Sequence, residues 1–197
     1  MKIVSTFAVV QDSLFSVLFD TEVNVVNENG AIIPNEQQHE FNRLFNFWND
    51  PKKLKVFFEE NLEDLNDAYW DEINIEEAIE KTKNEATELQ KILLEYAKAG
   101  QTIRLKNLSM LFKPLSKGKY DKEFEKDKTK VEGKKTWLRL YAIRVEANFF
   151  VVYGGAIKLR KTLNDRPYLL QELNKLEITR NYLLDEDNDN LEFFEIN

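Results

Sequence analysis

The chain contains no cysteine and a single histidine, His39. Without thiols it can form neither disulfide bonds nor thiolate zinc sites, and a cysteine-free sequence is typical of proteins from a reducing compartment. One histidine is too few for a metal site built from several imidazoles. We therefore expect a cytoplasmic protein that carries no metal and no other cofactor.

Glycine and proline are scarce, and long apolar runs are missing. Only 6 glycines and 4 prolines occur in 197 residues, so most of the chain should lie in regular elements. No stretch approaches the roughly 18 apolar residues of a membrane span, and the N-terminus lacks the cleavage site of a signal peptide. With 43% apolar residues, the chain can bury one sizeable core, and we expect no membrane partner.

Charge is distributed unevenly along the chain. Residues 1–100 contain 9 basic and 20 acidic side chains, a balance of −11, whereas residues 101–166 contain 17 and 7, a balance of +10. Such asymmetry indicates that the basic segment faces an anionic partner or the acidic half of the same chain. Lysine-rich surface that is only solvated produces the same pattern.

Apolar periodicity divides the chain into strands and helices. Phe41, Leu44, Phe45 and Trp48 have helical spacing and fall on one face, and Asn74 can cap a long helix. Helices are expected from residue 35 to Trp48, over Lys52–Asn61, Leu62–Trp70 and Asn74–Ala99, and from Arg166 onward. Strands are expected over Lys2–Val10, Ser13–Asp20, Trp137–Val145, Phe149–Tyr153 and Ala156–Leu159.

This order of elements predicts an α+β fold in one domain, residues 1–197. An antiparallel sheet is expected from the N-terminal hairpin and the C-terminal strands, packed with a helical insertion and a C-terminal helix. The insertion, 35–100, is the acidic part, and 105–180 is the basic, strand-rich part. Motifs for phosphate loops, dinucleotides, zinc proteases, calcium loops and serine hydrolases do not occur.

Chemistry is concentrated in the basic strands. Arg139, Tyr141 and Ile143 alternate along one predicted strand and so share one face. A sheet face that presents cations beside Tyr141 or Tyr153 can hold phosphates and stack a base. The pattern therefore favours an RNA-binding surface.

Four segments in this part carry a family resemblance. They are Leu111–Leu115 (LFKPL), Leu138–Tyr141 (LRLY), Phe149–Tyr153, which a glycine pair follows, and Lys158–Thr162 (KLRKT). Their order resembles the C-terminal half of the RelE/HigB-type toxins of bacterial toxin–antitoxin pairs, and the similarity covers roughly residues 105–180.

The resemblance implies a small α+β sheet fold and a ribosome-dependent mRNA endonuclease that inhibits translation. It also implies a partner antitoxin, often a helix-turn-helix protein. Family enzymes use in-line attack by a 2′-hydroxyl, with cations that stabilise the phosphate and a side chain that moves protons. Carried over to this sequence, the catalytic candidates are Arg139, Tyr141, Lys158 and Arg160, and the nucleic-acid-binding candidates are Lys113, Arg144, Tyr153 and Lys161.

The chain also departs from the family pattern. It is about twice the usual toxin length, it is acidic overall, and its basic segment contains no histidine. The same fold includes members that poison gyrase without nuclease chemistry, so the fold alone does not establish the activity.

Three other interpretations fit the sequence. The cations could be structural, with Arg139 and Arg144 paired to acidic helices and 158–161 protecting a sheet edge. The protein could be a non-enzymatic binding module whose acidic helices mimic nucleic acid or dock a basic partner, through Glu59, Glu60, Glu63 and Asp64. The acidic insertion could also lie against the basic sheet and silence it.

Overall fold

The structure, a computed structural model, describes residues 1–20, 25–26, 32–33, 38–66, 73–103, 105–114, 125–129, 136–159 and 167–184. Its strands are β1 (Ile3–Val10), β2 (Leu14–Phe19), β3 (Val25–Val26), β4 (Ile32–Ile33), β5 (Phe112–Pro114), β6 (Glu125–Thr129), β7 (Leu138–Glu146) and β8 (Phe149–Ile157). Its helices are α1 (Glu40–Asn49), α2 (Pro51–Glu60), α3 (Leu62–Leu65), α4 (Ile75–Ala99) and α5 (Pro167–Leu184), with a 3-10 turn at Leu108–Met110.

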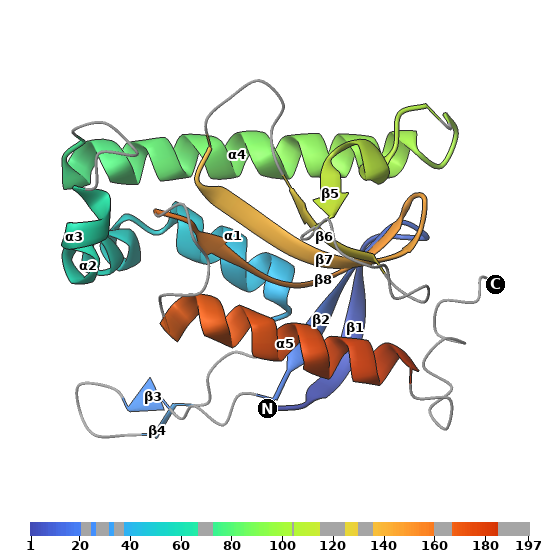
Figure 1. The fold of residues 1–197 in the computed structure, drawn as a ribbon, viewed down its shortest axis with the longest axis horizontal. Coiled ribbons are helices and arrows are strands. Elements are labelled where there is room, and N and C mark those ends of the chain that lie inside the picture. The colour runs from blue at the N-terminus through green and yellow to red at the C-terminus, as the bar shows by residue number, and fades with distance from the viewer. Residues whose placement is uncertain are drawn as a thin grey trace.

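One sheet of six strands organises the fold (Figure 1), with the order β1-β2-β8-β7-β6-β5. The N-terminal hairpin and the C-terminal strands thus belong to one sheet, and the predicted α+β class is confirmed. One detail differs from the expected antiparallel sheet. β2 and β8 run parallel where they meet, and the chain between them passes through the helical segment and then through three strands, β5 to β7, that pair antiparallel with their neighbours.

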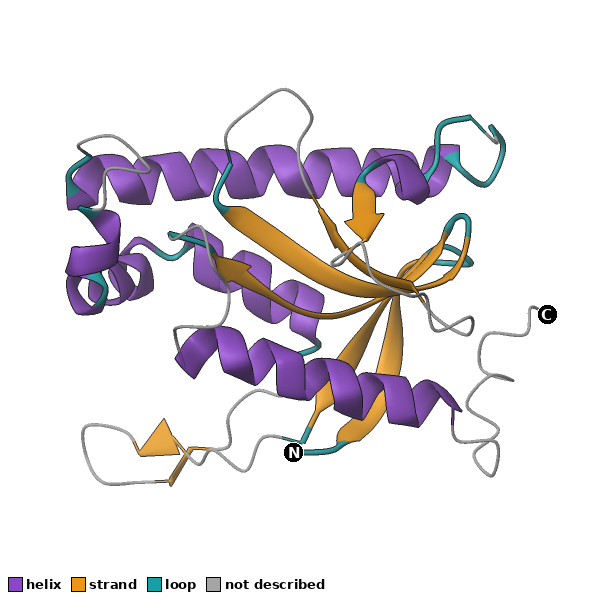
Figure 2. Cartoon of the chain, in the orientation of Figure 1, coloured by secondary structure: helices purple, strands orange, loops and turns teal. Residues whose placement is uncertain are grey.

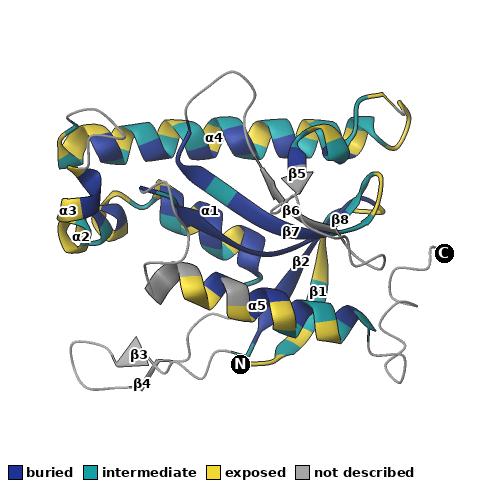
Figure 3. Cartoon of the chain, viewed as in Figure 1, coloured by how far each residue is buried: buried dark blue, intermediate teal, exposed yellow. Residues whose placement is uncertain are grey.

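Helices cover both faces of this sheet (Figure 2). α1 packs on β2 and β8, α4 packs on β7, and α5 packs on β8 and β1 from the opposite side. Burial follows this arrangement, since every residue of β2 and every residue of β8 after Phe149 is buried (Figure 3). Strands covered on both faces lose the apolar–polar alternation of a half-exposed strand.

Two hydrophobic clusters result. The larger lies between the sheet and α1, α2 and α4, and contains Trp48, Leu93, Trp137 and Leu140 among its buried side chains. The smaller lies under α5, which contributes Leu176 and Leu183 to it. The predicted insertion 35–100 therefore shares its main core with the strands.

Local signals explain where the helices begin. Asn74 Oδ1 accepts from the Glu77 backbone N–H, and the Glu77 carboxylate accepts from the Asn74 N–H, so α4 starts with a complete capping box. Asp50 Oδ1 accepts from the N–H groups of Lys52 and Lys53, with Pro51 in the first turn of α2. Both helix starts agree with the sequence prediction.

Other segments differ from the prediction. α3 is a single turn that ends at Leu65, well before Trp70. The connector near residue 110 forms a 3-10 turn and the short strand β5, and the charged stretch after it supplies β6 to the sheet. Strand β8 continues through the glycine pair, with a bulge at Tyr153 where the pairing moves from Tyr141↔Gly154 to Ala142↔Val152.

Among the described helices, none combines the length and the apolar character that crossing a bilayer requires.

Because α4 shares the main core with the sheet, its buried face should contribute strongly to stability. Leu93 is 0% exposed, and we expect Leu93→Ala to lower the free energy of unfolding by about 2–5 kcal/mol. Urea unfolding followed by tryptophan fluorescence would measure this. Leu62→Ala, at a side chain 45% exposed, is the control and should change stability by less than about 1 kcal/mol. Equal small losses would show that α4 is not part of the core.

Candidate functional site

The two candidate tyrosines are buried. Tyr141 and Tyr153 are 4% and 1% exposed, with ring centroids 6.1 Å apart in a stacked arrangement. Leu176 and Leu183 of α5 belong to the same cluster. The expected open face for base stacking is therefore wrong in this structure, because α5 covers the face on which the tyrosines lie.

Arg139 is held by its own strand. Its Nη1 donates to Thr136 Oγ1 at 3.2 Å and to the Leu138 carbonyl at 2.6 Å, and the residue is half-buried. These contacts bind the guanidinium to the backbone where β7 begins. They support the structural interpretation of Arg139, through contacts at the start of β7.

Among the described residues, the candidates Lys158 and Arg144 lie in different parts of the β7–β8 pair. Lys158 follows the end of β8 and pairs with the start of β7, where its backbone N–H donates to the Trp137 carbonyl. Arg144 lies five residues along β7 from Arg139, a separation of about 17 Å. Both are half-buried. Arg160 and Lys161 lie outside the described residues.

Lys113 occupies a different place, in β5 at the edge of the sheet. It is paired in register with Lys128 of β6, which is paired in turn with Tyr141. Lys126 stands two residues before Lys128 and so on the same face. We call Lys113, Lys126 and Lys128 the lysine row.

A cluster of buried charges, which the sequence analysis did not identify, joins α1, α5 and β8. It consists of Glu40, Arg43, Glu172 and Lys175 and is called the ionic cluster below. Lys175 Nζ donates to Glu40 Oε2 and to Glu172 Oε1, both at 2.9 Å. Arg43 binds the Glu40 carboxylate through two nitrogens, at 2.8 and 2.7 Å. The Arg43 side chain is 42% exposed, whereas the other three are below 10%.

The ionic cluster sits where the sheet divides. β2 pairs with β8 only from Leu14↔Phe150 to Ser16↔Val152, and beyond this point the strands diverge (Figure 1). We call this point, after Ser16↔Val152, the fork. α1 begins beside the fork, and its Phe41 N–H donates to Ser16 Oγ at 2.8 Å. The edge of β8 past Val152 thus carries backbone groups that β2 does not pair.

Glycine is required on β8 at the fork. The Gly155 N–H donates to Glu172 Oε2 at 2.8 Å. A Cβ at Gly154 would lie 1.8 Å from that carboxylate oxygen, and a Cβ at Gly155 would lie 2.7 Å from the Arg139 carbonyl. Gly154 therefore permits the close approach of the Glu172 carboxylate from α5, and Gly155 permits the close packing of β7 and of α1 against β8.

Glu172 and Glu40 are both buried, but their pKa values shift in opposite directions. Burial raises the pKa of Glu172 above its ordinary value, although Lys175 opposes the shift. Burial also disfavours the charged form of Glu40, but Arg43 and Lys175 outweigh it and hold the pKa of Glu40 below its ordinary value. Next to the cluster, burial lowers the pKa of His39, whose ring stacks on Phe7 at 5.5 Å.

The main role of the ionic cluster is structural. A carboxyl with a raised pKa beside a lysine is a pair that active sites use for proton transfer. Here Glu172 and Lys175 are both less than 10% exposed and bind protein groups, so only Arg43 reaches the surface. The ionic cluster fixes α5 against α1 and β8.

A sequence signal for the cluster existed. Glu40 and Arg43, like Glu172 and Lys175, are opposite charges three residues apart on helices. That spacing is common on exposed helix faces, so it gives no reason to expect burial.

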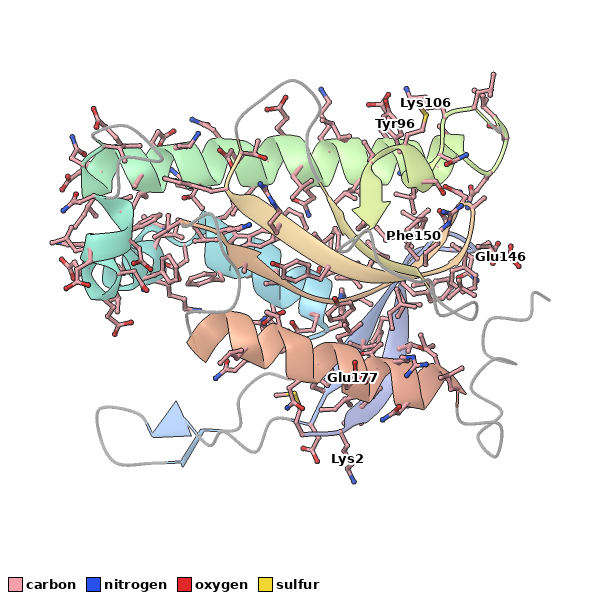
Figure 4. All side chains as sticks on the ribbon, in the orientation of Figure 1. Lys2, Tyr96, Lys106, Glu146, Phe150 and Glu177 are labelled. Carbon is pink, nitrogen blue, oxygen red and sulfur yellow. The ribbon has the colours of Figure 1, made fainter. Side chains whose placement is uncertain are left out.

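The acidic helices do not form an uninterrupted acidic surface in the described residues. Glu59, Glu60 and Glu63 are exposed, but Asp64 is fully buried, and Lys55 lies 3.8 Å from Glu59. On α4, Lys81 pairs with Glu85 and Lys83 with Glu80. At the end of α4, Lys106 binds Glu95 and lies over the Tyr96 ring (Figure 4).

α4 also reaches the basic strands through one carboxylate. Glu85 Oε2 accepts from the backbone N–H groups of Trp137 and Leu138 at 3.0 and 3.2 Å. The helical insertion thus contacts β7 through apolar packing and this backbone contact. A displaceable acidic shield over the sheet does not match this arrangement.

Comparison of the chain with protein-family models, curated proteins and solved structures gave no match.

The ionic cluster predicts a pH-dependent mutant. Lys175→Met removes the lysine partner of the buried Glu172 while Arg43 still binds Glu40, and we expect a loss of about 3–5 kcal/mol of unfolding free energy near neutral pH. Without the lysine, the buried Glu172 carboxyl holds its proton more tightly in the folded than in the unfolded state, whereas Glu40 remains bound to Arg43. Stability of the variant should therefore rise relative to wild type as the pH falls from about 8 to about 5.

Chemical denaturation at several pH values measures this difference. Lys55→Met is the control, since this lysine is 60% exposed and its pair should contribute less than about 1 kcal/mol at any pH. A Lys175→Met loss that stayed constant with pH would contradict the assignment of the loss to the unpaired Glu172 carboxylate.

Proposed function

We propose that the protein is a toxin of a toxin–antitoxin pair that arrests growth by binding RNA or the ribosome. The proposal follows the resemblance of residues 105–180 to the RelE/HigB-type toxins. It is supported by the α+β sheet in which the basic segment supplies one end, β5 to β8.

The lysine row is the observation that carries the proposal. In β6, the sequence EKDKT alternates acid and lysine, so Lys126 and Lys128 fall on one face, and Glu125 and Asp127 fall on the other. Register places Lys113 beside Lys128 on the same face.

The spacing suits a phosphate backbone. Paired residues on neighbouring strands lie about 5 Å apart, and alternate residues along a strand lie about 7 Å apart. Three lysines within such a footprint favour a polyanion over a single small anion, and binding of this kind weakens steeply with salt. α5 packs on β8 and β1, at the other end of this face.

The proposed RNA-binding surface is therefore the sheet edge with the lysine row, and not the face that contains Tyr141 and Tyr153. With Tyr141 and Tyr153 buried, RNA cleavage would depend on cations such as Lys158 and on a proton acceptor other than these two phenols. We propose binding as the arresting step and treat cleavage as the outcome to be measured. A partner antitoxin, of helix-turn-helix type in the family that the chain resembles, would neutralise the protein.

Tightly induced expression tests the proposal. We expect wild type to stop growth, with incorporation of labelled amino acids falling before that of labelled nucleosides. Lys113→Ala/Lys128→Ala should restore growth, and the purified variant should bind single-stranded RNA at least about tenfold more weakly with a shallower salt dependence. Primer extension on a reporter mRNA would show whether transcripts are cut.

Lys53→Ala/Lys55→Ala is the matched control, because it removes two exposed lysines from α2 without touching the sheet. It should remain toxic. Thermal melting of all three proteins would confirm that each variant is folded. Normal growth with wild type, or toxicity that survives in the folded lysine-row variant, would contradict the proposal.

A further inference from the structure

The lysine row stands on the same face of the sheet as α5. Lys128 is paired in register with Tyr141, and residues paired across an antiparallel ladder share one face. Tyr141 belongs to the cluster under α5. On β5, Phe112 belongs to the larger cluster on the opposite face, so the next residue, Lys113, falls on the face of α5 as well.

α5 lies beside the lysine row. The helix packs on β8 and β1, and β7 separates β8 from β6. α5 follows β8 in the chain and runs back along the sheet, so its last residue, Leu184, lies on the side of the β7–β8 turn (Figure 1). β6 begins on that side too, because Glu125 is paired with Arg144 near the end of β7. The chain therefore leaves α5 toward the same side of the sheet.

Thirteen residues, 185–197, follow α5 and lie outside the described part of the chain. They read DEDNDNLEFFEIN, with six acidic side chains and no basic one, and we call them the acidic tail. The strongly basic part of the chain, 101–166, has a balance of +10 and contains the lysine row. Charge complementarity therefore favours this part of the protein as the binding site of the acidic tail.

The position of the acids is unfavourable for α5 itself. The carbonyl groups at the C-terminus of a helix give it a partial negative charge, so acidic residues directly after it are repelled. Asp185, Glu186 and Asp187 follow Leu184 directly, and the last turn of α5 contains no basic residue. Cations from another part of the chain would offset this repulsion.

The acidic tail is long enough to reach the lysine row. β8 and β6 are two strand spacings apart, about 10 Å, and an extended chain spans about 3.3 Å per residue. The first five residues of the tail, 185–189, can therefore span about 16 Å, and they contain four of the six acids. The segment 190–197 contains four apolar side chains, which can pack on the aliphatic stems of lysines.

We propose that the acidic tail binds over the lysine row of the same molecule and competes with RNA for it. The competition rests on the proposed function, whereas the contact between tail and row does not. Because the tail is tethered beside the row, its effective concentration is high, and RNA must displace it before binding. The tail therefore lowers the apparent affinity of the protein for RNA.

The absence of cysteine allows the contact to be measured directly in the full chain. In Lys126→Cys/Asp187→Cys, one thiol lies in the lysine row and the other in the acidic tail. Under mild oxidation at low salt, we expect a disulfide within one molecule, identified by mass spectrometry of the digested monomer. Raising the salt to about 0.5 M should slow its formation, because salt screens the attraction.

Asp127→Cys/Asp187→Cys is the matched control. Residue 127 lies next to Lys126 on the opposite face of β6, so this pair should crosslink at least about tenfold more slowly and without dependence on salt. Equal rates for the two pairs would overturn the contact. Disulfides between molecules, with a yield that rises with protein concentration, would overturn the intramolecular arrangement. Melting temperatures of the reduced variants show that each is folded.

The competition is measured by neutralising the acidic tail in the full chain. The variant carries Asp185→Asn, Glu186→Gln, Asp187→Asn and Asp189→Asn. We expect it to bind single-stranded RNA at least about fivefold more tightly than wild type at low salt, with a difference that shrinks as the salt concentration rises.

A second variant carries the same change in net charge on the acidic helices. It replaces four exposed residues, as Glu60→Gln, Glu63→Gln, Glu76→Gln and Glu80→Gln. This variant should bind RNA within about twofold of wild type, because charges far from the row are screened. Equal gains in the two variants would overturn the competition. If none of the three proteins binds RNA, the proposed function and the competition are both contradicted, whereas the crosslinking rates still decide whether the tail occupies the row.

Discussion

The fork between β2 and β8 is the constraint on which the arrangement of the layers depends. Three elements meet there. α1 supplies Glu40 and Arg43 of the ionic cluster, α5 supplies Glu172 and Lys175, and the Gly155 N–H of β8 binds Glu172. Burying charges is costly unless each one finds its partner in good geometry. The cluster therefore links α5 to α1 through the contact of Lys175 with Glu40.

Closing both faces of the sheet determines where interactions can occur. α1 and α4 cover one face of β7 and β8, and α5 covers the other, so their aromatic side chains become core. The two sheet edges differ in chemistry. β5 and β6 contain the lysine row, whereas β1 contains no charged residue.

Local chemistry made much of the fold predictable. The capping box at Asn74, the Asp50–Pro51 start of α2 and the turn between β1 and β2 act over a few residues, so their signals can be read directly. The site was less predictable. Period two correctly placed Arg139 and Tyr141 on one face, but alternation does not say whether a helix covers that face. Arg139 instead binds the backbone beside it, and Tyr141 packs under α5.

The sequence by itself determined the α+β class, the order of most elements, the separation of acidic from basic residues and the absence of thiol chemistry. These follow from composition and from interactions between near neighbours. The tertiary structure decided the parallel pairing of β2 with β8, the burial of Tyr141 and Tyr153, and the contact between Glu40 and Lys175, 135 residues apart. Such features depend on which distant segments share one low-dielectric interior, and no short-range pattern encodes that.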